Sequence, residues 1–211
     1  ASTKAVTNQI LAQLLLAYKI GLENGCSYKD YKNFLLEVQK LPYFINKVIA
    51  QEEKIKGICG TYKDSKTAFV VGRNVLEHIA REIALKIKEI SYIHAEGYSG
   101  SELKHGPLAL IDDQILNICL LYKNFYPKKT ISNIEEIRAR GGKVILVTNY
   151  TKQEIGNKIY DRLISVETGE NKFITAMVFN VVGQLMSYYF ALHNNRNVDL
   201  PRNLAKSVTV E

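Results

Sequence analysis

Hydrophobic side chains recur every three to four residues through the first sixty positions of the chain, as expected for helices that bury one face. A strongly apolar stretch covers residues 3–24, and Gly25 follows it as a stop signal. A second amphipathic stretch runs over residues 31–49 and is interrupted at Pro42, and a third covers residues 52–58. This pattern predicts an all-helical segment before the first strand.

The pattern changes near residue 67, where a short run of consecutive apolar residues is followed by a glycine and then by a helical repeat. Similar strand-turn-helix units follow along the chain. Strands are expected at residues 68–71, 115–121, 143–147 and 163–166, and helices at residues 75–90, 131–140 and 173–192. Strands that are apolar at every residue must be covered on both faces. The sequence therefore predicts an α/β fold, a three-layer sandwich with a mostly parallel sheet flanked by helices.

Composition narrows the classes of function. The chain has 211 residues, of which 46% are hydrophobic and 23% charged, as in ordinary folded proteins. Its longest uninterrupted apolar runs are much shorter than the roughly 20 residues of a membrane-spanning helix, so no membrane span is expected. The net charge of +7 comes from lysines spread along the helices. That distribution fits a small anionic substrate better than nucleic acid.

The chain contains three widely spaced cysteines, Cys26, Cys59 and Cys119. Their odd number and the lack of any CxxC pair or cysteine-histidine cluster favour neither a disulfide framework nor a zinc site. A reducing cytoplasm is the simplest location. The opening residues show no leader composition and pass directly into helical periodicity, so we expect the chain to be a piece of a longer protein.

Three charged residues share one face of the helix expected at residues 75–90. Glu82, Lys86 and Glu89 follow one another at spacings of four and three residues. Alternating charge at this spacing usually marks a solvent-exposed face with weak ion pairs. In the competing interpretation, Lys86 stabilises an anion or a developing oxyanion while Glu89 abstracts a proton. The spacing alone leaves both interpretations open.

Residues 91–107 are denser in His, Glu, Tyr and Lys than the rest of the chain. His94 and His105 enclose two carboxylates, but no HExxH-type helical pair exists, so a metal site is disfavoured. His105 precedes Gly-Pro, which favours a loop and a role in proton transfer, although a structural histidine fits equally well. Taken in isolation, Lys206 in the polar C-terminal stretch resembles an ordinary exposed lysine.

Four segments of the chain resemble the isomerase half of the glutamine:fructose-6-phosphate amidotransferase family. Two are long internal blocks, LKIKEISYIHAE at residues 85–96 and ELKHGPLALID at residues 102–112. The others are the C-terminal LPRNLAKSVTVE, residues 200–211, and the opening ASTKAVT, residues 1–7. The resemblance covers the whole chain and implies the sugar-isomerase (SIS) fold.

The resemblance also implies a division of the chain. Residues 1–25 correspond to the terminal helix of a preceding SIS subdomain, residues 26–60 to a helical connector, residues 61–194 to the second SIS subdomain and residues 195–211 to a catalytic tail. The first SIS subdomain, with its phosphate-binding serine/threonine-rich loop, and the N-terminal glutaminase domain are absent. None of the three cysteines stands at a position resembling the glutaminase nucleophile. We expect a homodimer or a higher oligomer.

Residue by residue, the resemblance assigns three roles on the helix at residues 75–90. Glu89 matches the base that moves a proton between C1 and C2 of the open-chain sugar. Lys86 matches a lysine beside the sugar oxygens. Glu82 matches a further carboxylate, to which we assign a supporting electrostatic role in the substrate site.

Three further roles lie outside that helix. His105 matches the histidine that assists ring opening and reaches the site from the neighbouring subunit. Lys206 matches the tail lysine that forms a Schiff base with the C2 carbonyl of fructose 6-phosphate, and Ala205 matches a backbone contact to substrate. No cofactor and no metal are implied. A lysine with a pKa of roughly 10.4 is a poor nucleophile at pH 7, so we expect the tail to fold over the pocket.

The implied activity is the conversion of fructose 6-phosphate and glutamine-derived ammonia to glucosamine 6-phosphate, with the isolated chain possessing the catalytic residues but lacking the phosphate loop. One alternative is an SIS-fold sugar-phosphate deglycase or isomerase without a glutaminase partner, which the C-terminal sequence disfavours. Another is a non-catalytic SIS module that binds sugar phosphates. The presence of Glu89, His105 and Lys206 together disfavours this second alternative.

Overall fold

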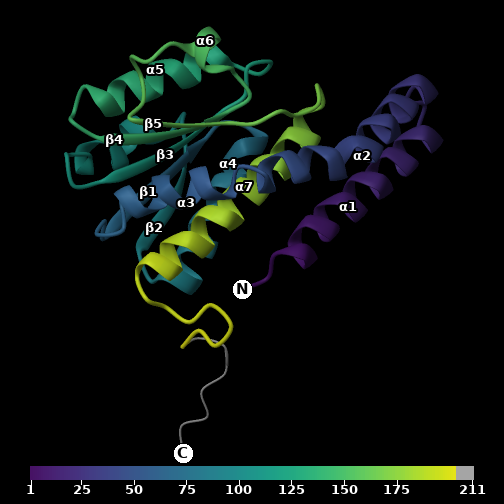
Figure 1. Ribbon diagram of the computed structural model, residues 1–211. Helices are drawn as coiled ribbons and strands as arrows, with labels where there is room; N and C mark the ends of the chain where they lie inside the picture. The colour runs from purple at the N-terminus through teal and green to yellow at the C-terminus, as the bar shows by residue number, and fades with distance from the viewer. Residues whose placement is uncertain (203–211) are drawn as a thin grey trace, which may run out of the picture.

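Five parallel strands form the centre of the protein, whose computed structural model describes residues 1–202 (Figure 1). In chain order the strands are β1 (Thr67–Gly72), β2 (His94–Ser99), β3 (Leu116–Leu121), β4 (Lys143–Thr148) and β5 (Arg162–Ser165). Their order across the sheet is β2-β1-β3-β4-β5, and every neighbouring pair is parallel. The predicted parallel α/β architecture is confirmed.

Helices cover both faces of this sheet. They are α1 (Lys4–Glu23), α2 (Tyr28–Ile49), α3 (Glu52–Thr61), α4 (Val75–Ser91), α5 (Pro127–Arg138), α6 (Lys152–Ile155) and α7 (Lys172–His193), with two short 3₁₀ turns, η1 (Leu103–His105) and η2 (Pro107–Leu110). The chain crosses from β1 to β2 in one direction and from β3 to β5 in the other. Because parallel crossovers are right-handed, this reversal places α4 and α5 on opposite faces.

The alternation of side chains along each strand separates two cores. In β3, Leu116, Ile118 and Leu120 point to the face covered by α4 and α7, whereas Cys119 and Leu121 point to the face covered by α5 and the 3₁₀ turns. All six residues of β3 are buried, as expected for the middle strand of a sheet covered on both sides.

Helix α7 runs through the larger core, beside α4 and below α3 in Figure 1. By length and composition alone it is apolar enough to cross a membrane, yet 72% of its most apolar window is buried inside the fold. The burial of α7 between α4 and the N-terminal helices therefore explains its hydrophobicity. The sequence pattern did not single out this helix as a possible span, because Asn180 and Gln184 break its apolar runs.

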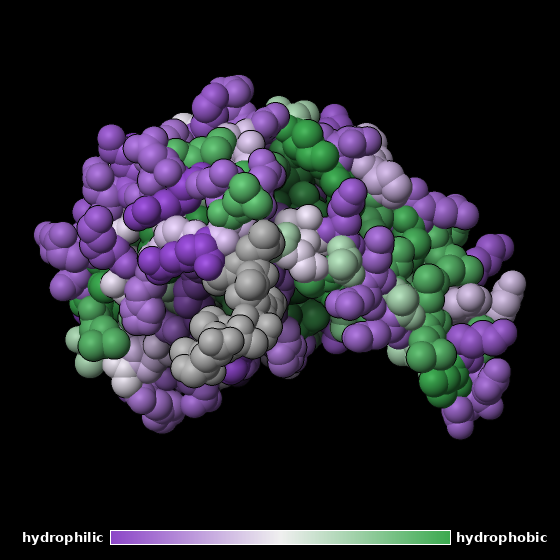
Figure 2. All heavy atoms as spheres, turned by 90° about the horizontal axis from the view of Figure 1, so that it is seen from below, coloured by the Kyte–Doolittle hydropathy of each residue, from purple (hydrophilic) through white to green (hydrophobic). Residues whose placement is uncertain are grey.

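Helices α1 and α2 form an antiparallel pair that extends from one end of the sheet layer (Figure 1). The rings of Tyr18 in α1 and Phe34 in α2 stack with their centroids 4.1 Å apart. No residue of α1 is fully buried, and Leu16 and Ile20 are half exposed. Figure 2 shows apolar side chains gathered on the lobe formed by these helices, so part of their apolar surface is uncovered in the described residues.

Two details differ from the sequence prediction. Pro42 lies inside α2 and does not interrupt it, because the apolar residues on both sides, Leu41 and Phe44, pack into one continuous core. Strand β2 was not among the expected strands, because its sequence HAEGYS lacks an apolar run. It forms at the edge of the sheet, paired with β1 from Thr67–His94 to Gly72–Ser99.

Candidate active site

The charged face of α4 is buried, contrary to the solvent-exposed ion-pair face that its spacing usually marks. Only 4% of the surface of Lys86 is exposed. Its Nζ donates a hydrogen bond of 2.6 Å to Oε2 of Glu89 and lies 3.6 Å from Oε1 of Glu82. A buried ammonium is tolerated only when carboxylates or hydrogen bonds compensate its lost hydration. The three residues therefore form one electrostatic unit, which we call the Lys86 cluster.

Burial raises the pKa of one carboxylate of the Lys86 cluster. The pKa of Glu82 is raised above its ordinary value, first by burial and then by the negative charge of Glu89, while Lys86 opposes both effects. Among the described residues, Oε1 of Glu82 has no hydrogen-bond partner. Glu89 is the carboxylate that Lys86 contacts directly. The cluster thus contains one carboxylate bound to an ammonium and one that burial pushes towards the neutral acid.

A cleft of about 250 Å³ opens beside Lys86. Helix α4 contributes Lys86 and Ile90 to its walls, and helix α7 contributes Gln184 and Ser187. The remaining walls come from Tyr188 of α7, from the first residues of the chain and from the segment after α7, including Asp199. Because its walls combine apolar surface with a buried cation and hydroxyl and amide groups, the cleft suits a small polar anion or sugar.

Sequence reasoning missed the contribution of α7 to this cleft. Gln184 and Ser187 stand three residues apart in an otherwise apolar helix, which was the available signal. The Gln184 side chain also donates to the carbonyl of Thr3, so it ties the start of the chain to α7 at the edge of the cleft. The opening residues and residues 198–199, which are almost 200 positions apart in sequence, therefore both line the cleft beside Lys86.

The structure does not bring His105 beside Glu89 within one chain. His105 is exposed at the end of η1. Its neighbours Leu103 and Leu108 pack into the core on the α5 face, whereas the Lys86 cluster lies on α4 at the opposite face. Ala205 and Lys206 lie outside the described residues. Of the six residues assigned by sequence, Glu82, Lys86 and Glu89 are thus the ones that come together in the described part of the chain.

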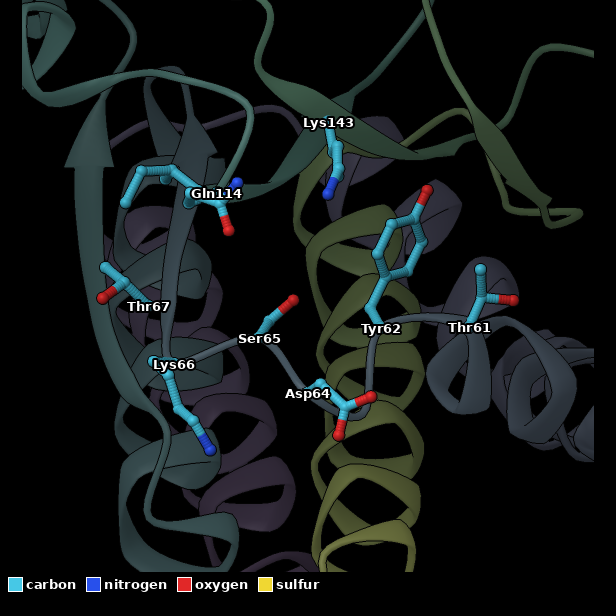
Figure 3. Close-up of a pocket in the computed structure, with 9 residues that line it drawn as sticks. Thr61, Tyr62, Asp64, Ser65, Lys66, Thr67, Gln114 and Lys143 are labelled. Carbon is cyan, nitrogen blue, oxygen red and sulfur yellow. The ribbon is translucent and has the colours of Figure 1, made fainter.

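A separate cavity of about 230 Å³ lies at the amino ends of β1, β3 and β4 (Figure 3). Figure 3 shows the Lys143 ammonium and the Ser65 hydroxyl directed into the space beside the Tyr62 ring. It shares no lining residue with the cleft at Lys86. No group of three or more metal-binding side chains was found within residues 1–202. Because Lys86 is buried beside two carboxylates and lines a cleft, we place the candidate chemistry at the Lys86 cluster.

Comparison with known proteins agrees with the resemblance seen in the sequence. The profile of the SIS domain family matches residues 61–194. The glutamine–fructose-6-phosphate aminotransferases (isomerizing) of Methanosarcina mazei and of Escherichia coli strain K12 are 42% and 41% identical to the chain over 212 aligned positions. In each case the match covers all of this chain and 34% of the relative. The chain thus spans about a third of the length of the curated relatives it matches.

A solved structure agrees with this similarity. The C-terminal domain of glucosamine-fructose-6-phosphate aminotransferase from Francisella tularensis superposes with a TM-score of 0.87 and 34% sequence identity. That match covers 94% of this chain and 56% of the other. The similarity therefore extends beyond the sheet to most of the helical segment that precedes it.

Proposed function

Because the chain belongs to the SIS domain family, we propose that it is the isomerase portion of a glutamine:fructose-6-phosphate aminotransferase. The reaction combines fructose 6-phosphate with glutamine-derived ammonia to give glucosamine 6-phosphate. The observation that carries this proposal is the buried Lys86, which lines a cleft and donates a hydrogen bond to Glu89. The segment that leads towards Lys206 borders the same cleft.

Lys206 begins the proposed chemistry as a nucleophile. Its neutral amine attacks C2 of the open-chain sugar, water leaves and an imine forms. Ammonia then replaces the lysine at C2 and releases the Lys206 amine, which leaves an imine between the sugar carbon and the incoming nitrogen. The positive charge of Lys86 beside the cleft favours the neutral form of a lysine brought near it.

Glu89 then moves the proton that converts the ketose skeleton into the aldose skeleton. The imine at C2 withdraws electrons and makes a C1 proton removable by a carboxylate base. Delivery of that proton to C2, with transfer of the O1 proton to the imine nitrogen, gives the C1 aldehyde and the C2 amine. Lys86 stabilises the negative charge that develops on the sugar oxygens, and Glu82 balances the charge of Lys86.

His105 enters this scheme from a second copy of the chain. Within one chain it lies on the opposite side of the sheet from Glu89, and it is exposed on a short turn. A role in ring opening therefore requires a homodimer or a higher oligomer in which the η1 turn of one copy meets the Lys86 cluster of another. This arrangement is part of the proposal.

The same proposal divides the chain into segments that end at residues 25, 60 and 194, followed by the tail. It also names the domains with which the chain would work. Residues 1–25 would complete a preceding SIS subdomain, and the exposed apolar residues of α1 fit a helix that lacks this partner. The sugar phosphate would be held by that subdomain, and ammonia would come from a glutaminase domain. We place the protein in the cytoplasm, where sugar phosphates are found and where its cysteines stay reduced.

Covalent trapping tests the proposal. Fructose 6-phosphate is added to the isolated chain and to a chimera in which the chain replaces the matching segment of the E. coli relative. Borohydride then reduces any imine, and peptide mass spectrometry locates the adduct. We expect an adduct on Lys206 in the chimera that Lys206→Arg abolishes and the exposed control Lys128→Arg retains.

Two outcomes of the trapping experiment separate the parts of the proposal. An adduct on Lys206 of the isolated chain as well would mean that the cleft assembles without the missing subdomain. A chimera whose thermal unfolding matches that of the E. coli parent but which gives no adduct on Lys206 would contradict the assignment, because the exchanged segment is then folded. Such a result would favour a non-catalytic sugar-phosphate-binding module.

A further inference from the structure

Tyr92 connects the end of α4 to the segment that precedes the C-terminal tail. It follows the last residue of α4 in a left-handed conformation, with a φ of 60°. Its hydroxyl accepts a hydrogen bond of 2.9 Å from the backbone N–H of Arg202. The guanidinium of Arg202 lies 4.1 Å from the centroid of the Tyr92 ring. Backbone and side chain of one residue thus contact the same tyrosine, 110 positions earlier in the sequence.

A second arginine contacts the same ring. The guanidinium of Arg196 lies 5.2 Å from its centroid, within the range in which a cation is attracted to an aromatic face. Residues 196–202 are therefore attached to Tyr92 near both ends. Between the two arginines, the Asn197 side chain accepts from the backbone N–H groups of Asp199 and Leu200. This segment is a defined turn rather than an open strand.

The anchored turn borders the cleft at the Lys86 cluster. Val198 and Asp199 line the cleft together with Lys86. Tyr92 follows Glu89 by three residues, a rise of about 4.5 Å along a helix axis. Lys206 follows Arg202 by four residues, which span at most about 14 Å when extended. The contact between Tyr92 and Arg202 therefore holds the residue from which the tail starts at the end of α4, the helix that carries Glu89.

We propose that Tyr92 is a positioning residue, which holds residues 196–202 against the end of α4 so that Lys206 meets the sugar carbonyl beside Glu89. This inference rests on the proposed function for the role of Lys206, while the anchor itself rests on the contacts of Tyr92. The tyrosine does not touch the reacting atoms. It acts by removing orientations of the tail from which Lys206 cannot reach C2.

The catalytic consequence is tested by the rate of Lys206 adduct formation in the chimera with the E. coli relative. Tyr92→Leu removes both the ring and the hydroxyl, and we expect the maximal rate to fall about tenfold. Tyr92→Phe keeps the ring that both arginines contact and loses only the hydroxyl that accepts the Arg202 hydrogen bond. We therefore expect the maximal rate to fall about twofold to threefold. The fructose 6-phosphate concentration at half-maximal rate should stay unchanged, because the anchor orients Lys206 rather than binding the sugar.

Tyr126 offers a matched control at a remote position. It also has a positive φ, 51°, and carries the Lys129 ammonium 5.6 Å from its ring centroid, but it lies at the start of α5. Tyr126→Leu therefore makes the same change in a similar backbone conformation and should leave the adduct rate unchanged. A double variant, Tyr92→Leu with Arg202→Leu, should be no slower than the slower single variant, because both substitutions break one contact.

Amide hydrogen exchange in the isolated chain tests the anchor independently of catalysis. Loss of the Tyr92 hydroxyl in Tyr92→Phe should accelerate exchange at the Arg202 amide about tenfold, and Tyr126→Phe should not. Unchanged exchange would overturn the anchor. An unchanged adduct rate in Tyr92→Leu, with the wild-type adduct present, would overturn the positioning role. If the wild-type chimera forms no adduct on Lys206, the proposed function is overturned, and with it the positioning role of Tyr92. The hydrogen-exchange result still decides whether Tyr92 anchors Arg202.

Discussion

The Lys86 ammonium donates a 2.6 Å hydrogen bond to the Glu89 carboxylate, three residues further along the same helix, and almost none of Lys86 is exposed to solvent. An exposed pair at this spacing contributes only a few tenths of a kcal/mol. A buried pair behaves differently, because removing one partner leaves the other charge without compensation. This difference allows the role of the Lys86 cluster to be measured.

Lys86→Met should lower the free energy of unfolding by about 2–3 kcal/mol, because Glu82 and Glu89 then repel each other at a largely buried site. The matched control is Lys56→Met, which removes an exposed pair with Glu53 at the same three-residue spacing. That control should change stability by less than about 0.5 kcal/mol. Urea titration of both variants checks this, and equal losses would show that burial adds nothing to the Lys86 pair.

The raised pKa of Glu82 predicts a specific dependence of stability on pH. As pH rises above the ordinary value of 4.5, the unfolded chain releases the Glu82 proton before the folded chain does, so the protein loses stability. Glu82→Gln removes this titration. The free energy of unfolding of the variant minus that of the wild type should therefore be larger at pH 7 than at pH 4. A difference that stays constant or becomes smaller from pH 4 to pH 7 would show that the pKa of Glu82 is not raised in the folded protein.

Cysteine reactivity should follow burial. Cys59 and Cys119 are buried, and burial raises the pKa of both thiols, that of Cys119 to about 12. Cys26 is exposed between α1 and α2. Under native conditions a thiol reagent should modify Cys26 alone, and all three cysteines should react in urea. Rapid native labelling of Cys59 or Cys119 would contradict the packing of α3 against α7 or of the sheet against α5, respectively.

Gly72 permits the close approach of β1 to the first turn of α4, which carries the Lys86 cluster. A Cβ at this position would lie 2.2 Å from the carbonyl oxygen of Leu76. Gly72→Ala should therefore destabilise the protein by about 1–3 kcal/mol. In the control Gly57→Ala, inside α3, a Cβ has no contact within 4 Å. That change should stabilise the protein by about 0.5–1 kcal/mol. Thermal unfolding of both variants decides whether the approach is as tight as described.

The fold was largely predictable because hydrophobic periodicity determines it. The apolar runs identified four of the five strands, and the alternation of strands and helices required a parallel sheet. β2 escaped prediction because its sequence HAEGYS contains no apolar run and has the composition of a loop. Pro42 was predicted to interrupt a helix that tertiary packing keeps continuous. In both cases contacts distant in sequence outweighed local preference.

The candidate site was predictable only in part. Helical spacing placed Glu82, Lys86 and Glu89 on one face, but it could not decide whether that face was exposed, whereas the structure buries Lys86. That burial depends on α7 and residues 198–199, which are about 100 positions away in sequence. Spacing also gave no sign that His105 and Glu89 lie on opposite sides of the sheet. The role of Tyr92 depends on a contact with Arg202 that no local motif announces.

The most direct test of the account is product formation by the chimera in which this chain replaces the matching segment of the E. coli relative. With fructose 6-phosphate and glutamine, we expect it to form glucosamine 6-phosphate. Glu89→Gln should lower the rate by at least about 100-fold while glutamine hydrolysis continues. A chimera that hydrolyses glutamine but forms no glucosamine 6-phosphate, or a Glu89→Gln variant as active as the parent, would contradict the assignment of the isomerase chemistry to the Lys86 cluster.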